Sequence, residues 1–207
     1  MIQFHKFISF IFHPIIIPIA SSILYFIIVP NHIPKGFSYR VLALVFAMTY
    51  IVPIFLLLFL KKVKLIDSYH LTSINERKFP ILFFTVLFFL IGKFLLKTNA
   101  INLLSYSFFG CSLALSLVYL LFSAKIKTSL HTLAIAGLIG FIITLSFHYK
   151  FNLQLLLIVL FLLFGSVATS RLKLKAHTLT EVILGFFIGF FSQMIVYFFY
   201  TFNNPIL

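Results

Sequence analysis

Long apolar runs constrain the fold of this 207-residue chain more than any other feature. Seven can be marked, at 7–29, 38–60, 80–97, 101–123, 129–149, 151–169 and 178–200. Most approach the length of about 20 residues that an α-helix needs to cross the hydrocarbon core of a bilayer. Backbone groups in that core have no water to bond, so each crossing segment must be a helix. The pattern predicts an all-α fold, a polytopic transmembrane helix bundle.

The number of crossings depends on the first run. It contains Pro14 and Pro18, which would kink a spanning helix or convert it into a shallow one. Six or seven spans are therefore expected. No repeat or low-complexity linker divides the chain, so we expect residues 1–207 to form a single integral membrane domain.

Charge and cysteine content exclude several function classes. The formal net charge is +13, but the Lys and Arg residues lie mainly in short loops between apolar runs and form no continuous basic patch. Phosphate-bearing lipid is thus a better anionic partner than nucleic acid. The single cysteine, Cys111, falls inside an apolar run, which excludes an internal disulfide and a Cys-rich metal site.

Three polar segments, 61–79, 124–131 and 170–177, are separated from one another by two spans each. An even number of crossings returns the chain to the same side of the membrane. All three segments are therefore predicted to lie at one end of the bundle, whether or not the first run crosses.

The last of these segments has the most specific spacing. His177 and Glu181 are four residues apart, which places them on one helix face within hydrogen-bond reach, and Arg171 precedes them. A carboxylate at that position can fix the imidazole tautomer and leave the other ring nitrogen free for nucleophilic attack. Metal binding by His177, Glu181 and His131 is the rival interpretation, but the surrounding cations favour an anionic substrate over a metal ion.

The middle segment resembles an anion site at a helix start. Thr128 or Ser129 can cap the helix that follows, leaving amide donors that attract phosphate, with Lys127 beside them. His131 could donate a proton to a departing oxygen. The alternative is an ordinary capped helix whose histidine bonds a neighbour.

The first segment places Arg77 and Lys78 before an apolar run, with Pro80 as the expected opening residue of the helix. These cations can capture phosphate or can act as topological anchors. The other histidines, His5, His13, His32 and His148, are expected to be interfacial residues near span ends.

Small residues indicate which helices approach closely. Gly185 and Gly189 continue the face of Glu181, and Ala136 and Gly140 lie on the helix after His131. Such residues let two membrane helices pack at short distance. If these four residues meet, His131 and His177 come to the same end of one helix pair.

The order and spacing of these residues resemble the phosphatidic acid phosphatase type 2 superfamily, in its membrane-embedded lipid phosphatase branch. The family signature has three blocks: Lys-x6-Arg-Pro, Pro-Ser-Gly-His and Ser-Arg-x5-His-x3-Asp. The third block matches through Ser170, Arg171 and His177, with Glu181 in place of aspartate.

The other two blocks are degenerate. Ser129 and His131 match the second, while Thr128 and Leu130 stand where the family has proline and glycine. In the first, Arg77 stands for the arginine, with His70 at the lysine position and Pro80 displaced by two residues. The resemblance covers residues 70–190.

The resemblance implies a lipid phosphatase that works through a phosphohistidine, without a metal or other cofactor. His177 would attack phosphorus, Glu181 would support it and His131 would protonate the leaving group. Arg171, Ser129 and Arg77 would hold phosphate oxygens; Lys78 and Lys127 are further charge donors suggested by their position alone. Candidate substrates are undecaprenyl pyrophosphate, phosphatidylglycerol phosphate, phosphatidic acid and a lipid A phosphate.

An alternative function is that of a catalytically weakened relative that binds or moves phospholipid without hydrolysis. It is favoured by the altered first block and by Leu130, which is expected to place a bulky side chain beside the phosphate pocket.

Two signals disagree on orientation. The predicted active side carries eleven Lys and Arg residues against five opposite, which favours a cytoplasmic site. The resemblance favours the outer side of a bacterial cytoplasmic (inner) membrane.

Overall fold

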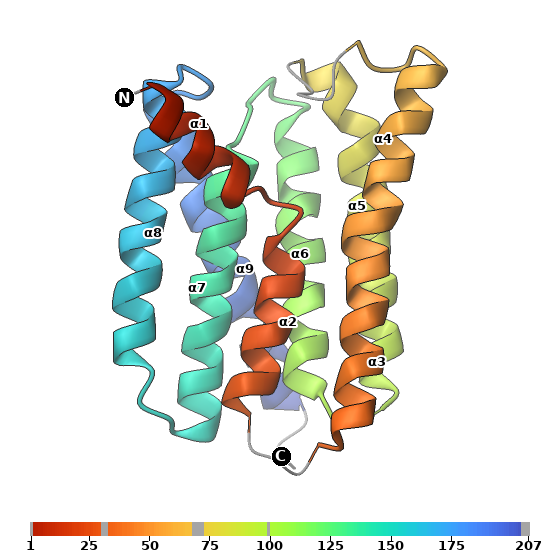
Figure 1. Ribbon diagram of the computed structural model, residues 1–207, viewed down its shortest axis with the longest axis vertical. Coiled ribbons are helices and arrows are strands. Elements are labelled where there is room, and N and C mark those ends of the chain that lie inside the picture. Colours follow the sequence, from red (N-terminus) through yellow and green to blue (C-terminus); the bar gives the residue numbers. More distant parts are fainter. Residues whose placement is uncertain (1, 30–32, 68–72, 99, 204–207) are drawn as a thin grey trace.

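The computed structural model describes residues 2–29, 33–67, 73–98 and 100–203, and shows a bundle of helices aligned near one common axis (Figure 1). The described residues contain no strand. The spanning helices are α3 (Lys35–Phe46) continued by a π-helical turn (Ala47–Ile51) and α4 (Val52–Lys62), then α5 (Ile74–Leu96), α6 (Asn102–Leu121), α7 (Leu130–Tyr149), α8 (Gln154–Lys173) and α9 (Leu179–Asn203). By length and hydropathy these make six candidate membrane spans in the described chain. The predicted all-α polytopic bundle is confirmed.

The first apolar run does not form a seventh long helix. It is divided into α1 (Ile2–Ile11) and α2 (Ile17–Ile28), with a turn at 12–16 that includes Pro14. Pro18 lies in the first turn of α2, where its missing N–H removes no helical bond. Each of these helices is too short to cross a bilayer alone.

The start of α5 differs from the prediction. Pro80 does not open the helix but lies inside it, because the helix begins six residues earlier, at Ile74, with Ser73 as its cap. The Ser73 side chain accepts from the Glu76 amide, and the Glu76 carboxylate accepts from the Ser73 amide. This capping box stabilises the first turn. Consequently Arg77 lies in the first helical turns and not in a loop.

Four helices end in the same type of turn. One to four residues after each end stands a lysine in the left-handed region, at φ 59, 58, 56 and 51 for Lys64, Lys125, Lys150 and Lys175. The next amide in each case bonds a carbonyl five residues back: Leu65 to Leu60, Ile126 to Leu121, Phe151 to Ser146 and Ala176 to Arg171. These turns satisfy carbonyls that the helix leaves open and place lysines near its negative end.

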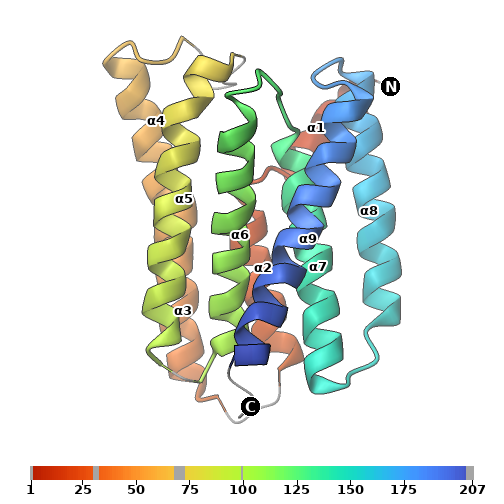
Figure 2. The ribbon, with the colours of Figure 1, turned by 180° about the vertical axis from the view of Figure 1, so that it is seen from behind.

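Among the candidate spans, α6 and α7 are the most buried, and α7 packs closely against α9 along its length (Figures 1 and 2). A Cβ atom on Gly185 would lie 2.5 Å from Thr132 Oγ1 and 2.7 Å from the Ser129 carbonyl. One on Gly189 would overlap the Leu133 carbonyl. The two helices therefore touch through backbone, which only glycine permits here.

The register of this pair differs from the proposed one. Gly185 faces Ser129 and Thr132 and not Ala136, and Gly140 faces Phe190 and Gln193. A hydrogen bond of 3.1 Å from the Ser129 amide to the Glu181 carbonyl sets the register by holding the start of α7 level with the start of α9.

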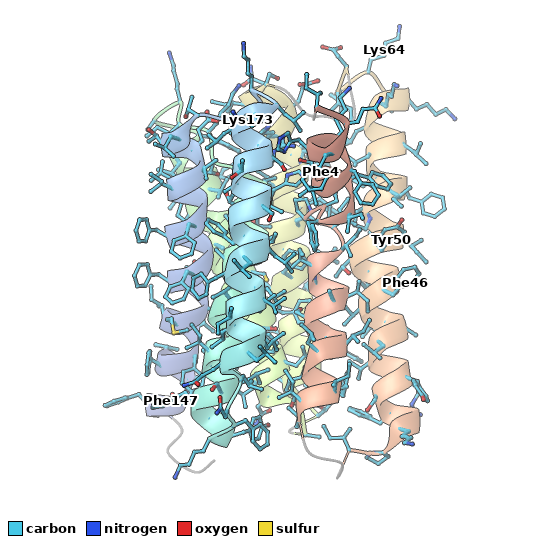
Figure 3. All side chains as sticks on the ribbon, turned by 60° about the vertical axis from the view of Figure 1, so that its left-hand side comes forward. Phe4, Phe46, Tyr50, Lys64, Phe147 and Lys173 are labelled. Carbon is cyan, nitrogen blue, oxygen red and sulfur yellow. The ribbon has the colours of Figure 1, made fainter. Side chains whose placement is uncertain are left out.

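The predicted sidedness is confirmed for the described residues. The end of α4, the start of α5, and the α6–α7 and α8–α9 connections all lie at one end of the bundle (Figure 1). Lys64 and Lys173 mark that end in Figure 3, and Phe147 marks the opposite one. We call the former the polar end.

We expect Gly189→Ala to destabilise the protein by about 1–3 kcal/mol, because the added methyl group forces α7 and α9 apart. Thermal unfolding in detergent should show a clear fall in Tm. The matched control is Gly165→Ala on α8, where a Cβ would meet nothing within 4 Å. Equal Tm values for the two variants would contradict the close α7–α9 contact.

Candidate functional site

The His177–Glu181 pair predicted from spacing is present at the polar end. His177 Nδ1 and Glu181 Oε2 are 2.7 Å apart. His177 lies just before α9 and not on its face, because Thr178 caps the helix: the Glu181 amide donates to Thr178 Oγ1, and the Thr178 amide donates to Glu181 Oε2. The carboxylate is thus held by the cap while it accepts from the imidazole. Nε2 is left as the nitrogen able to attack.

The surroundings of His177 favour the neutral imidazole. Burial lowers the pKa of His177 below its ordinary value of 6.5, and the positive charges of Arg171 and Arg77 lower it further. The hydrogen bond and negative charge of Glu181 act in the opposite direction but do not offset the burial. A neutral imidazole has the lone pair that nucleophilic attack requires.

Two arginines from different helices converge near this pair. Arg77 on α5 interacts electrostatically with Glu181, and Arg171 on α8 lies close enough to repel Arg77. Arg77 Nη1 also donates to the Thr128 carbonyl at 3.5 Å. Two guanidinium groups held near each other beside one carboxylate form an arrangement that a bound dianion would stabilise.

Two buried polar atoms in this region have no hydrogen-bond partner among the described residues. One is Nε of Arg171 itself, and the other is Oγ1 of Thr128. Leaving such atoms unsatisfied is costly, and a ligand oxygen would satisfy a donor at either position. Both atoms belong to segments that the sequence predicts to bind phosphate.

The start of α7 matches part of its prediction. Ser129 caps the helix by accepting from the Thr132 amide at 3.5 Å, and it is fully buried. His131 lies close enough to Arg171 and His177 to interact with them electrostatically. Leu130, in contrast to the expectation, packs in an apolar cluster with Ile81 and Phe122.

Sequence reasoning missed the contribution of the N-terminal segment. His131 Nε2 donates to the Ser9 carbonyl at 3.1 Å, and Arg171 Nη1 donates to Ser9 Oγ at 3.4 Å. The His13 ring packs edge-on against His131, with centroids 5.3 Å apart. The available signal was the pattern of α1, in which His5 and Ser9 share a face between exposed apolar residues.

Lys127 and Lys78 are the two other cations that the sequence predicts as charge donors. Lys127 lines a hollow of about 350 Å³ together with His177, Glu181 and Lys175. Lys78 is exposed, and the structure gives it no hydrogen bond to the described site residues. His70 and His32 lie outside the described residues.

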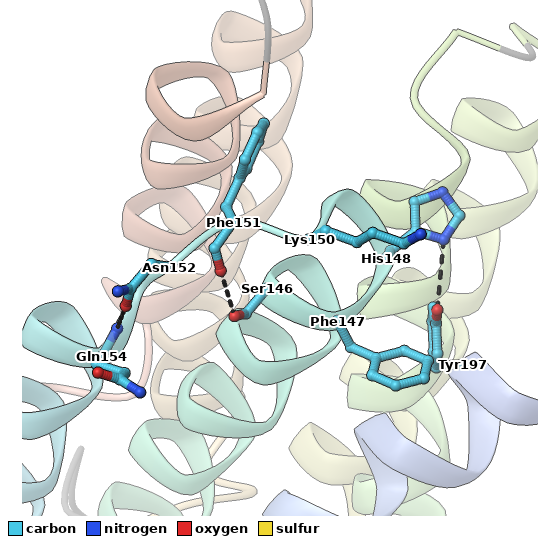
Figure 4. Close-up of a pocket in the computed structure, with 8 residues that line it drawn as sticks. All are labelled: Ser146, Phe147, His148, Lys150, Phe151, Asn152, Gln154 and Tyr197. Carbon is cyan, nitrogen blue, oxygen red and sulfur yellow. Dashed lines mark hydrogen bonds between the residues drawn. The ribbon is translucent and has the colours of Figure 1, made fainter.

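A larger hollow of about 660 Å³ lies at the opposite end of the bundle (Figure 4). Its polar groups bond one another: His148 pairs with Tyr197 at 3.3 Å, and Ser146 Oγ donates to the Phe151 carbonyl at 2.6 Å. It contains one cation, Lys150, and no carboxylate. The smaller hollow is therefore the better candidate site, although His131 and Arg171 do not line it.

No group of three or more His, Cys, Asp or Glu side chains within the described chain is placed to hold a metal ion.

Comparison of the sequence with protein-family models and with curated proteins, and of the structure with solved structures, gave no match.

We expect Glu181→Gln to lower the pKa of His177 further, because the substitution removes the charge and weakens the hydrogen bond that stabilise the imidazolium. Histidine NMR titration of the protein in micelles, assigned with His177→Ala, measures this. In the parent protein His177 should titrate below 6.5, the ordinary value. Glu76→Gln, on the other glutamate of the polar end, should leave the midpoint unchanged; a midpoint that rises in Glu181→Gln would refute the pairing.

Proposed function

We propose that this protein is a membrane lipid phosphatase that hydrolyses a lipid phosphate or an isoprenyl pyrophosphate through a phosphohistidine. The main support for this proposal is the 2.7 Å hydrogen bond between His177 Nδ1 and Glu181 Oε2, which lies near Arg77 and Arg171. It combines an oriented, neutral nucleophile with a cationic surround, which phosphoryl transfer to a side chain requires. We place the protein in a bacterial cytoplasmic membrane.

The proposed reaction has two steps. His177 Nε2 attacks phosphorus, the bond to the ester or anhydride oxygen breaks, and that oxygen takes a proton from the His131 imidazolium. The dianionic phosphate beside it stabilises this imidazolium. Water then attacks the phosphohistidine as His131 takes its proton, the N–P bond breaks and phosphate leaves.

The cations would hold the three non-bridging oxygens throughout. Arg171 offers guanidinium N–H groups to the phosphate oxygens, among them the unpartnered Nε, and Arg77 approaches from α5. Lys127 faces the hollow beside His177. The position at one end of the bundle suits a substrate whose headgroup lies at the interface while its chain stays in lipid.

A lipid-binding protein without hydrolysis is the second candidate. It is favoured by the hydrogen bond from His131 to Ser9, which engages the proton that a leaving oxygen would need. The bulk of Leu130 no longer favours it, because that side chain packs in an apolar cluster.

Purified protein in detergent should release phosphate from at least one of phosphatidic acid, phosphatidylglycerol phosphate, undecaprenyl pyrophosphate and a lipid A phosphate. His177→Ala should lower the rate by at least about a thousandfold, since the nucleophile is lost. The matched control, His148→Ala, changes a histidine at the opposite end and should retain the parent rate. Full activity in His177→Ala would end the assignment.

The role given to His131 has its own test. A general acid matters most for a poor leaving group, so His131→Ala should lose about 100-fold or more with an alkyl phosphate but much less with p-nitrophenyl phosphate. Steady-state rates with both substrates measure the ratio. Equal losses with the two would show that His131 holds the substrate and does not protonate it.

A further inference from the structure

The N-terminal helix α1 lies at the polar end, tilted across α7 and α8 (Figure 1). It has ten residues, and Ser9 is its only buried side chain. Large apolar side chains on its outer side are exposed: Phe4, Phe7 and Phe10. Figure 3 shows Phe4 near the level of Lys173. A short helix with one apolar face suits the boundary between headgroups and acyl chains.

The inner side of α1 engages groups that the proposed reaction needs. Ser9 accepts twice, with its carbonyl from His131 Nε2 at 3.1 Å and with its hydroxyl from Arg171 Nη1 at 3.4 Å. His5 Nδ1 lies 3.0 Å from Ser170 Oγ. Because the Ser170 hydroxyl already donates to the Ser166 carbonyl, His5 must be the donor in that bond.

Ser9 thus presents two oxygens to the two residues that would bind and protonate a phosphate group. A phosphate offers the same kind of acceptor, with charge in addition, and charge-assisted bonds are about twice as strong as neutral ones. A phosphate could therefore take the place of Ser9.

We propose that α1 is a displaceable cover: the structure is the closed form, and the phosphate of a lipid substrate replaces Ser9 as the partner of His131 and Arg171. The inference rests on the proposed function. It explains why the hollow beside His177 is not lined by His131 or Arg171, since α1 lies over that half of the site.

The contacts of α1 suit repeated opening. Three polar contacts and the buried Ser9 hold its inner side, and Ile8 is its one large apolar side chain packed against the core cluster. Few apolar contacts therefore oppose the movement of α1. Its exposed apolar side can remain in the interface during movement, so the new apolar surface that opening exposes is mainly that of Ile8 and its core contacts. The turn at 12–16, with Pro14, connects it to α2, which packs in the core.

Holding α1 closed tests the proposal through activity. In a Cys111→Ala background, His5→Cys with Ser170→Cys is joined by a short, reducible bis-thiosulfonate linker. We expect phosphate release from lipid substrate to fall at least about tenfold on crosslinking and to return with reductant, because only the open form binds substrate. Each single cysteine variant should keep its own rate with and without the linker. An unchanged rate in the crosslinked protein would overturn the cover.

A labelling experiment reports α1 without relying on hydrolysis. Ser9→Cys is introduced into Cys111→Ala/His177→Ala, and its maleimide labelling rate is measured in mixed micelles with phosphatidic acid or with phosphatidylcholine. Phosphatidic acid should raise the rate at least about threefold, by shifting α1 to the open form. Phe10→Cys, at an exposed position, should label equally in both.

The two experiments separate the cover from the phosphatase. Faster Ser9→Cys labelling by protein whose His177 parent hydrolyses none of the lipids would support the cover and refute the phosphatase. Equal labelling with the two lipids would refute the cover even if hydrolysis is observed.

Discussion

The backbone contact between α7 and α9 determines the geometry of the polar end. Gly185 and Gly189 let α9 approach the backbone of α7, and the Ser129 amide bonds the Glu181 carbonyl across the pair. In lipid, helix association depends on close packing and on such bonds, because the surrounding chains are as apolar as the helix surfaces. The same contact holds His131, in the first turn of α7, level with His177, which lies just before α9 and 46 positions further along the chain.

Charge at this end is unbalanced. Arg77, Arg171 and Lys127 surround the His177–Glu181 pair, and Arg77 and Arg171 repel each other. Near a low-dielectric interior this repulsion is weakly screened, so an anion with two charges would relieve it. Burial lowers the pKa of His177, and the charges of Arg171 and Arg77 lower it further, which favours the neutral imidazole. The two arginines thus favour both a bound anion and a neutral His177, which are the two conditions that the proposed function needs.

Several predictions from the sequence depended only on local spacing and are confirmed. The predicted hydrogen bond between His177 and Glu181 is present, although His177 lies before α9 and not on its face, and Ser129 caps its helix. Others failed where a neighbouring interaction was stronger. The capping box at Ser73 moved the start of α5 ahead of Pro80, and the bond between Ser129 and Glu181 shifted the α7–α9 register away from Ala136. The inward position of Ser9 has no strong local signal, because its partners come from α7 and α8.

The sequence by itself determined that this chain is a membrane helix bundle and that its polar segments gather at one end. Hydrophobic length and the parity of crossings suffice for both conclusions, since neither depends on which helices touch. Only the tertiary structure decided which residues meet there. Arg77, Arg171 and His131 lie near His177. The Leu130 side chain packs in an apolar cluster, and α1 lies against the candidate site. Those outcomes follow from packing between helices that are distant in sequence, and such packing depends on all of the contacting surfaces together.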